Sequence, residues 1–327
     1  MEDPKPLSRY LGCNHTIATT GAKGSRITQA IFDMSDYNRQ ALQEYQVNTG
    51  LTVKPAASPF APELPKAQLD ALLQQKGKFG EFAASHLMKL MFGGRMACPL
   101  LSVAIQRLSC NISRWTAECD RRLHRIYCYL SAHCDDVLTG SLCETDLAGM
   151  QAIAWPDADL NGDIMTSKST SGFFLELAGQ DGRGMPIAWG TKRQGSTSSH
   201  TCEAETVSLS TVLRTELIPV QHFLQVVFGR PFPARLMEDN SATIVACEKG
   251  YSPSLRHIPR TQRIGLGFIS EVVSQEATDE EGDIRIVKAD TAEHRGDCFT
   301  KELSPQKFAA ATSLLRVQPL SKLKAKL

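Results

Sequence analysis

The order of the predicted elements after residue 150 is the feature that most constrains the fold of this chain. Three successive strand patterns come first, and a Gly-rich turn over 179–184 joins the second to the third. Helical and strand patterns then alternate, and Gly229 and Pro231 end the first helix. The predicted strands are 151–158, 173–177, 185–192, 234–238 and 284–287, and the predicted helices are 200–228, 262–275 and a last one that begins at Asp297. This order predicts an α/β fold with a mixed five-stranded sheet flanked by helices.

The chain before residue 150 has a different character, because helical spacing of apolar residues dominates it. We predict helices over 26–49, 80–93 and 99–133, the last one broken near Cys110 and Asn111. Three prolines within 53–62 predict an extended connector. The sequence therefore predicts a mainly helical segment over 1–145, an α/β domain over 150–310 and a basic tail over 311–327.

Composition sets outer limits on function. A chain of 327 residues with 42% hydrophobic residues is long enough for two domains, and its net charge of +1 gives no global attraction for nucleic acid. Ten cysteines without a CxxC pair favour reduced thiols and an intracellular place, cytoplasmic or nuclear. We expect no membrane partner, because no apolar run approaches the ~20 residues of a membrane span and the N-terminus lacks a signal-peptide core.

Four acids, Asp157, Glu205, Asp239 and Asp297, lie where strands end or helices begin. Each acid alone is more typical of a helix cap or a solvated loop. Four carboxylates on one mixed sheet and its helices, however, are suited to hold two divalent metal ions, and two-metal sites cut phosphodiester bonds.

The residues around these acids carry a resemblance to a known family. Seven blocks occur in order, and they are Asp157-Ala158-Asp159, Ser169-Thr170-Ser171-Gly172-Phe173, Ile187-Ala188-Trp189, Glu203-Ala204-Glu205, Asp239-Asn240-Ser241-Ala242, Arg256-His257-Ile258 and Asp297-Cys298-Phe299-Thr300-Lys301. In these blocks the second half resembles the ribonuclease H domain of copia-type long-terminal-repeat retrotransposon Pol polyproteins. The first half resembles the C-terminal end of reverse transcriptase and its connection, through residues 33–37, 95–99 and 120–123. No YxDD-like turn of a polymerase site is present.

The resemblance implies a metal-dependent endonuclease that hydrolyses the RNA strand of RNA–DNA hybrids during reverse transcription. It implies that Asp157, Glu205, Asp239 and Asp297 are catalytic and bind two Mg²⁺ ions, with Mn²⁺ as a possible substitute. The family register favours Asp157 over Asp159 and Glu205 over Glu203, which is expected to point outward or toward the substrate. The implied partners are an RNA–DNA hybrid and the polymerase domain of the same polyprotein.

Substrate contacts are expected from basic and polar residues around the presumed cleft. These candidates are Lys192, Arg193, Asn240, Ser241, Arg256 and His257. His294, three residues before Asp297, is a weaker candidate for a proton shuttle or for product release.

Several alternatives stay open at this point. Arg114, Arg121, Arg122 and Arg125 form either a basic stripe along a nucleic acid or a solvated helix face balanced by acids. The group His124, Cys128, His133 and Cys134 has the wrong spacing for a zinc finger. The whole chain is alternatively an inactive retroelement remnant that acts as a nucleic-acid-binding or interaction module, or another nuclease or transposase-like enzyme of the same superfamily.

Overall fold

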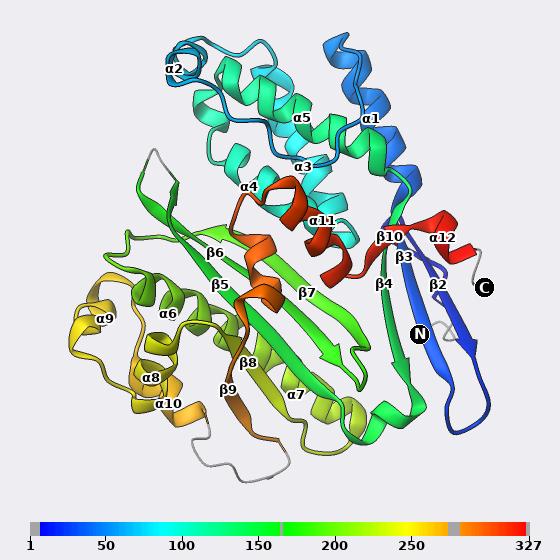
Figure 1. The fold of residues 1–327 in the computed structure, drawn as a ribbon, viewed down its shortest axis with the longest axis vertical. Helices are drawn as coiled ribbons and strands as arrows, with labels where there is room; N and C mark the ends of the chain where they lie inside the picture. Colours follow the sequence, from blue (N-terminus) through cyan, green and yellow to red (C-terminus); the bar gives the residue numbers. More distant parts are fainter. Residues whose placement is uncertain (1–6, 164–165, 274–281, 325–327) are drawn as a thin grey trace, which may run out of the picture. The chain divides into compact units, whose positions relative to one another are not determined.

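The computed structural model describes residues 7–163, 166–273 and 282–324. Contacts divide the chain into two compact units (Figure 1). The first unit comprises Met1–Ala18, Ala30–Thr139 and Glu302–Leu327, and the second comprises Thr19–Gln29 and Gly140–Lys301. No helix among the described residues is long and apolar enough to cross a membrane.

The second unit contains the mixed sheet that the sequence predicts. Strands β5 (Gln151–Asp163), β6 (Lys168–Ala178) and β7 (Gly184–Arg193) form an antiparallel meander. Strands β8 (Ala234–Glu238) and β9 (Ile284–Lys288) continue the sheet in parallel on the other side of β5. In the resulting order β7-β6-β5-β8-β9, the first strand of the meander, β5, lies at the centre. The predicted ribonuclease H-like α/β fold is therefore confirmed.

Helices of the second unit follow the strands as expected, with local differences. They are α6 (Thr201–Val212), α7 (Ile218–Phe228), α8 (Ser241–Lys249), α9 (Ile258–Thr261) and α10 (Leu266–Val272). The helix predicted over 200–228 contains a π-helical turn, Leu213–Leu217, just before Pro219. A proline lacks the N–H that a continuous α-helix needs, so the ladder is interrupted there. Gly229 ends α7 with φ of +63°. Helix α10 begins at Leu266 rather than at 262, and the predicted residues 274–275 lie outside the described part.

The core of this unit fixes the central strands against α6. Ala154 on β5, Leu236 on β8 and Leu209 on α6 are all fully buried in one apolar cluster. Burial of this kind stabilises by about 25 cal/mol for each Å² of apolar surface. The middle of β5, the end of β8 and the start of α6 are therefore firmly packed supports for polar side chains.

The first unit is mainly helical. Its helices are α1 (Ser35–Thr49), α2 (Lys66–Gln74), α3 (Gly80–Met96), α4 (Ser102–Ser109), α5 (Ala117–His133), α11 (Pro305–Leu314) and α12 (Leu320–Lys324). The predicted break near Cys110 is confirmed, and the Thr116 side chain caps α5 by accepting from Cys119 N. The proline-rich connector is extended and joins α5 through Ala56 N, which donates to Cys128 O at 3.1 Å.

Strands of the N-terminal part were not predicted. They are β1 (Arg9–Tyr10), β2 (Cys13–Thr20), β3 (Ile27–Asp33) and β4 (Asp136–Cys143), neighbours in that order. The helix predicted over 26–49 is thus wrong for its first turns. The backbone of Ile27–Asp33 pairs with its neighbours in the sheet, so strand pairing overrides the helical spacing of its apolar residues.

The last described residues form a short strand and a short helix. Strand β10 (Val317–Pro319) pairs antiparallel with β4 through Val317 and Leu138. Leu315 is fully buried and Leu323 is 3% exposed. Apolar residues between the lysines therefore anchor this segment to the first unit.

Candidate metal centre

Four acids of the second unit come from four separate elements, and two overlapping groups bring them together. One group joins oxygen atoms of Asp157, Glu205 and Asp239, and the other joins atoms of Asp157, His294 and Asp297. Within each group the atoms lie within 4.8 Å of one another. Asp157 belongs to both groups, so it is the centre of the cluster. The metal-binding role of these residues stays a prediction.

Asp157 lies on β5, and the segment 295–301 contacts its side chain. Its side chain is 1% exposed. Thr300 Oγ1 donates a hydrogen bond to Asp157, and Lys301 Nζ lies 3.5 Å from Asp157 Oδ1. Burial raises the pKa of Asp157, while the charge of Lys301 opposes the rise. The carboxyl therefore depends on neighbouring cations for its charge.

Glu205 lies in the first turns of α6 and is 4% exposed. Burial, and then the nearby acids Asp157, Glu238 and Asp239, raise its pKa to about 11. Glu205 Oε2 is buried and has no hydrogen-bond partner among the described residues. A buried carboxyl oxygen without a partner is unfavourable, and a bound cation would remove this penalty.

Asp239 follows the last residue of β8 and is held on both sides. Thr291 Oγ1 donates to Asp239 Oδ2 at 2.9 Å, and Lys288 Nζ donates to the Asp239 carbonyl oxygen. The next residue, Asn240, caps α8 by accepting from Ala242 N at 3.0 Å. The strand end and the helix cap together fix the direction of the Asp239 carboxylate.

Asp297 does not open the last helix, as the sequence suggested. It lies in a 3-10 turn, Arg295–Phe299, whereas α11 begins at Pro305 after the Ser304 cap. Lys301 Nζ contacts the Asp297 carboxylate. Two glycines let this turn approach the sheet: a Cβ on Gly172 would lie 2.5 Å from Phe299 O, and one on Gly296 would lie 2.7 Å from Trp155 O. Close backbone packing therefore brings Asp297 to Asp157.

The near neighbours of the acids behave differently from them. Glu203 is 1% exposed and does not point outward, which corrects that expectation. It accepts from Ser199 N at 2.8 Å and from Gln262 Nε2 at 3.3 Å, and its Oε2 lies 3.1 Å from His257 Nε2. Glu203 therefore ties the start of α6 to the 257–262 segment. Asp159 is on β5 opposite Thr170 and belongs to neither acid group.

Sequence reasoning missed Glu238 as part of the site. It is 1% exposed, and its Oε1 accepts from Asn240 N at 2.9 Å, across the turn that carries Asp239. Burial raises the pKa of Glu238 to about 8. Its position next to Asp239 in the sequence could have indicated a role in the site. Successive residues of a strand point to opposite faces, however, so alternation alone does not predict that both acids point inward.

The predicted substrate residues are spread over several elements. Lys192 is exposed on β7, and Ser241 is exposed at the start of α8. Arg193 forms an ion pair with Asp163 at 2.6 Å, and Arg256 donates to Tyr251 Oη at 2.6 Å and lies over its ring. Asn240 serves as the α8 cap. These roles in binding stay predictions.

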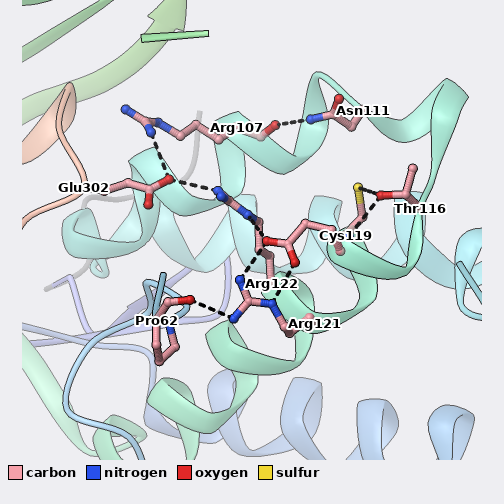
Figure 2. A network of polar contacts seen from close by, with 9 residues as sticks. Pro62, Arg107, Asn111, Thr116, Cys119, Arg121, Arg122 and Glu302 are labelled. Atoms are coloured by element: carbon pink, nitrogen blue, oxygen red, sulfur yellow. Dashed lines mark hydrogen bonds and ion pairs between the residues drawn. The ribbon is translucent and has the colours of Figure 1, made fainter. Parts of the chain in front are cut away.

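The basic residues of α5, in the first unit, pair with acids rather than forming an open stripe. Figure 2 shows Arg121 and Arg122 directed at acidic partners. Arg122 Nη1 and Arg107 Nη1 each lie 2.9 Å from Glu302 Oε1, and Glu118 accepts from Arg121 and Arg122. Arg125 Nε donates to the carbonyl oxygens of Ser58 and Phe60. The balanced-face alternative is therefore favoured over nucleic-acid tracking for these residues.

The histidines of the same helix have protein partners as well. His124 Nδ1 lies 3.1 Å from Tyr45 Oη, and His133 Nδ1 lies 2.7 Å from Asp136 Oδ2. Cys128 and Cys134 are buried, unpaired thiols. These contacts account for the residues as parts of the helical packing.

Comparison with known proteins finds a similarity to one retroelement polyprotein. No family model matches it. The chain is 24% identical over 320 residues, 96% of its length, to the retrovirus-related Pol polyprotein from transposon TNT 1-94 of Nicotiana tabacum, and it spans 22% of that protein. The predicted resemblance to a retrotransposon Pol polyprotein is thereby confirmed.

A solved structure also matches part of the chain. Ribonuclease H1 from Halobacterium salinarum NRC-1 aligns with 46% of this chain and 94% of its own, at 17% identity and a TM-score of 0.29. At this TM-score the match adds nothing to the fold, which the strand order of the second unit defines.

Proposed function

We propose that the second unit hydrolyses the RNA strand of RNA–DNA hybrids with two divalent metal ions, as part of a retrotransposon Pol polyprotein. The observation that carries this proposal is the meeting of Asp157, Glu205, Asp239 and Asp297 from four separate elements. The similarity to a Pol polyprotein supports the substrate class, since reverse transcription produces such hybrids. The polymerase domain of the same polyprotein is the proposed partner.

The donor set fits Mg²⁺, with Mn²⁺ as a substitute. Most donors are carboxylate oxygens, which hard divalent cations prefer. The unpartnered Oε2 of buried Glu205 supports a cation at this place. Asp157, Glu205 and Asp239 would hold one ion, and Asp157 and Asp297 the other. When bound, two such ions supply activation of a nucleophile and stabilisation of the leaving oxygen.

The chain's own residues orient and balance these acids. Thr300 fixes the rotation of the Asp157 carboxylate, and Thr291 fixes that of Asp239. Lys301 lies next to both Asp157 and Asp297 and supplies positive charge to them. Burial lowers the pKa of Lys301, but the two acids outweigh burial and raise it. The ammonium therefore stays charged and reduces the repulsion within the cluster.

Exposed groups around the acids are proposed to hold the substrate. Lys192 is proposed to contact phosphates, together with Arg193, Arg256 and His257. Asn240 and Ser241 lie directly after Asp239, at the start of α8. The Ser241 side chain, which is exposed, would contact the sugar-phosphate backbone next to the acids.

A cleavage assay tests the proposal. The intact chain, incubated with Mg²⁺ and a hybrid labelled on its RNA strand, is expected to shorten that strand, and chelation by EDTA is expected to stop the reaction. Asp239→Asn is expected to lose the activity while keeping its circular dichroism spectrum, because it removes charge without changing shape. A folded chain that leaves the hybrid intact with both Mg²⁺ and Mn²⁺ contradicts the proposal and favours the inactive binding module.

The raised pKa of Glu205 predicts a pH-dependent stability of the metal-free protein. The pKa rises from 4.5 to about 11, so between these values the folded state holds a proton that the unfolded chain releases. The contribution of Glu205 to the free energy of unfolding therefore falls as pH rises above 4.5, by at most about 1.4 kcal/mol per pH unit. Glu205→Gln cannot ionise, so with EDTA it is expected to melt higher than the unaltered chain at pH 8 and at the same temperature at pH 4. An equal difference at both pH values, in thermal denaturation, would count against this explanation.

A further inference from the structure

His294 is a buried group inside the acid cluster that the sequence assigned only a weak role. Its side chain is 2% exposed. One ring nitrogen lies within 4.8 Å of one oxygen each from Asp157 and Asp297. Ligands about 2.1 Å from one ion lie at most about 4.2 Å apart, so a small movement of the two carboxylates would bring all three atoms to a common ion.

The hydrogen bonding of the ring leaves one nitrogen for a ligand. His294 Nε2 lies 2.9 Å from the Met237 carbonyl oxygen, which only accepts, so Nε2 carries the hydrogen and donates. The other nitrogen, Nδ1, is buried and has no hydrogen-bond partner among the described residues. A metal-binding histidine has this same arrangement, with one N–H given to a backbone carbonyl and the other nitrogen free.

The segment that carries His294 is fixed in place. Arg295 forms an ion pair with Glu176, which is 2% exposed, and the Arg295 guanidinium lies 5.2 Å from the centre of the Trp155 ring. The Trp155 ring also meets His294 edge-on, with centroids 5.7 Å apart. A Cβ on Gly296 would lie 2.8 Å from His294 Cε1, so the backbone closes directly on the ring. A ring held in this way suits a ligand better than a mobile proton carrier.

We propose that His294 Nδ1 is a metal ligand beside Asp157 and Asp297, and that this subsite selects Mn²⁺ over Mg²⁺. The inference rests on the metal site of the proposed function and adds a nitrogen to its ligands. Imidazole nitrogen binds first-row transition metals well, whereas Mg²⁺ prefers oxygen. The subsite formed by Asp157, Glu205 and Asp239 has oxygen ligands alone and keeps no such preference.

Pulsed electron paramagnetic resonance of Mn²⁺ bound to the full chain tests this ligand without any cleavage. The unaltered chain is expected to show a ¹⁴N coupling to Mn²⁺ that becomes a ¹⁵N coupling when the histidines are ¹⁵N-labelled. His294→Gln is expected to lose the coupling and to bind Mn²⁺ about 10-fold more weakly by titration calorimetry, with Mg²⁺ affinity nearly unchanged. His222→Gln, an exposed change on α7, is the matched control and is expected to keep both.

The possible results separate this inference from the proposed function. Mn²⁺ bound without nitrogen coupling in the unaltered chain overturns the inference, and hybrid cleavage would still stand on the four acids. Nitrogen coupling that His294→Gln removes supports the inference even if no hybrid is cleaved. Should His294→Gln not fold, the isotope change in the unaltered chain decides, and a persistent coupling in a folded His294→Gln protein overturns the assignment.

Discussion

Asp157→Asn is expected to reduce hybrid cleavage by at least about 10²–10³-fold, the loss that follows removal of one strong electrostatic stabiliser of a transition state. Asp157 is the only residue shared by both acid groups found among the described residues, and it is 1% exposed. The substitution keeps the shape of the side chain and its contact with Thr300, so the protein is expected to fold. Initial rates at saturating Mg²⁺ measure the effect.

The matched control for this prediction lies two residues further along the same strand. Asp159 shares the face of Asp157 on β5 but belongs to neither acid group. Asp159→Asn is expected to keep cleavage within about 10-fold of the unaltered chain, far above Asp157→Asn. A larger loss in Asp159→Asn would mean that the acid register is shifted by two residues.

Asp146→Asn is expected to produce the largest loss of stability, about 2–3 kcal/mol, because hydrogen bonds to a buried charged group are strong. Asp146 is fully buried and accepts from the backbone N–H groups of Cys143 and Gln180, at 2.6 and 2.8 Å. Arg183 adds two further bonds at 2.9 Å. The carboxylate therefore joins the end of β4 to the turn between β6 and β7. Urea denaturation at pH 7 measures the change.

Asp181→Asn is the control for this prediction. Asp181 contacts the same arginine at 3.3 Å, but its side chain is 81% exposed, so its loss is expected to change stability by less than about 0.5 kcal/mol. Arg183 lowers the pKa of Asp146, so this contribution is present above the ordinary carboxyl pKa and is lost as pH falls below about 4. Equal losses in the two variants would contradict the role of burial.

The second half of the fold was predictable because burial and periodicity agree there. Strand β8 matches the predicted residues, since a short segment bounded by Pro233 and Asp239 leaves little choice of its ends. The sequence also indicated the turn over 179–184, where Gly182 has φ of +72°. By contrast, Ile27–Asp33 has no alternation typical of a strand, and only its partners in the sheet make it one.

The candidate site was predictable in its acids but not in their surroundings. The elements that carry Asp157, Glu205 and Asp239 were predictable, because a strand, a helix start and a strand end are local features of the sequence. The 3-10 turn around Asp297 depends on close packing at Gly172 and Gly296, which no local pattern shows. The inward place of Glu238 and the carbonyl contact of His294 also arise from residues distant in the sequence. Tertiary packing therefore decided the parts that local reasoning missed.

Which strand of an RNA–DNA hybrid is cleaved tests the central claim most directly. The measurement follows, in parallel, hybrids labelled on the RNA strand or on the DNA strand, with Mg²⁺, for the intact chain and for Asp239→Asn. We predict shortening of the RNA strand alone by the intact chain and of neither strand by Asp239→Asn. Cleavage that persists in Asp239→Asn, or an intact RNA strand with the folded unaltered chain, would contradict the account.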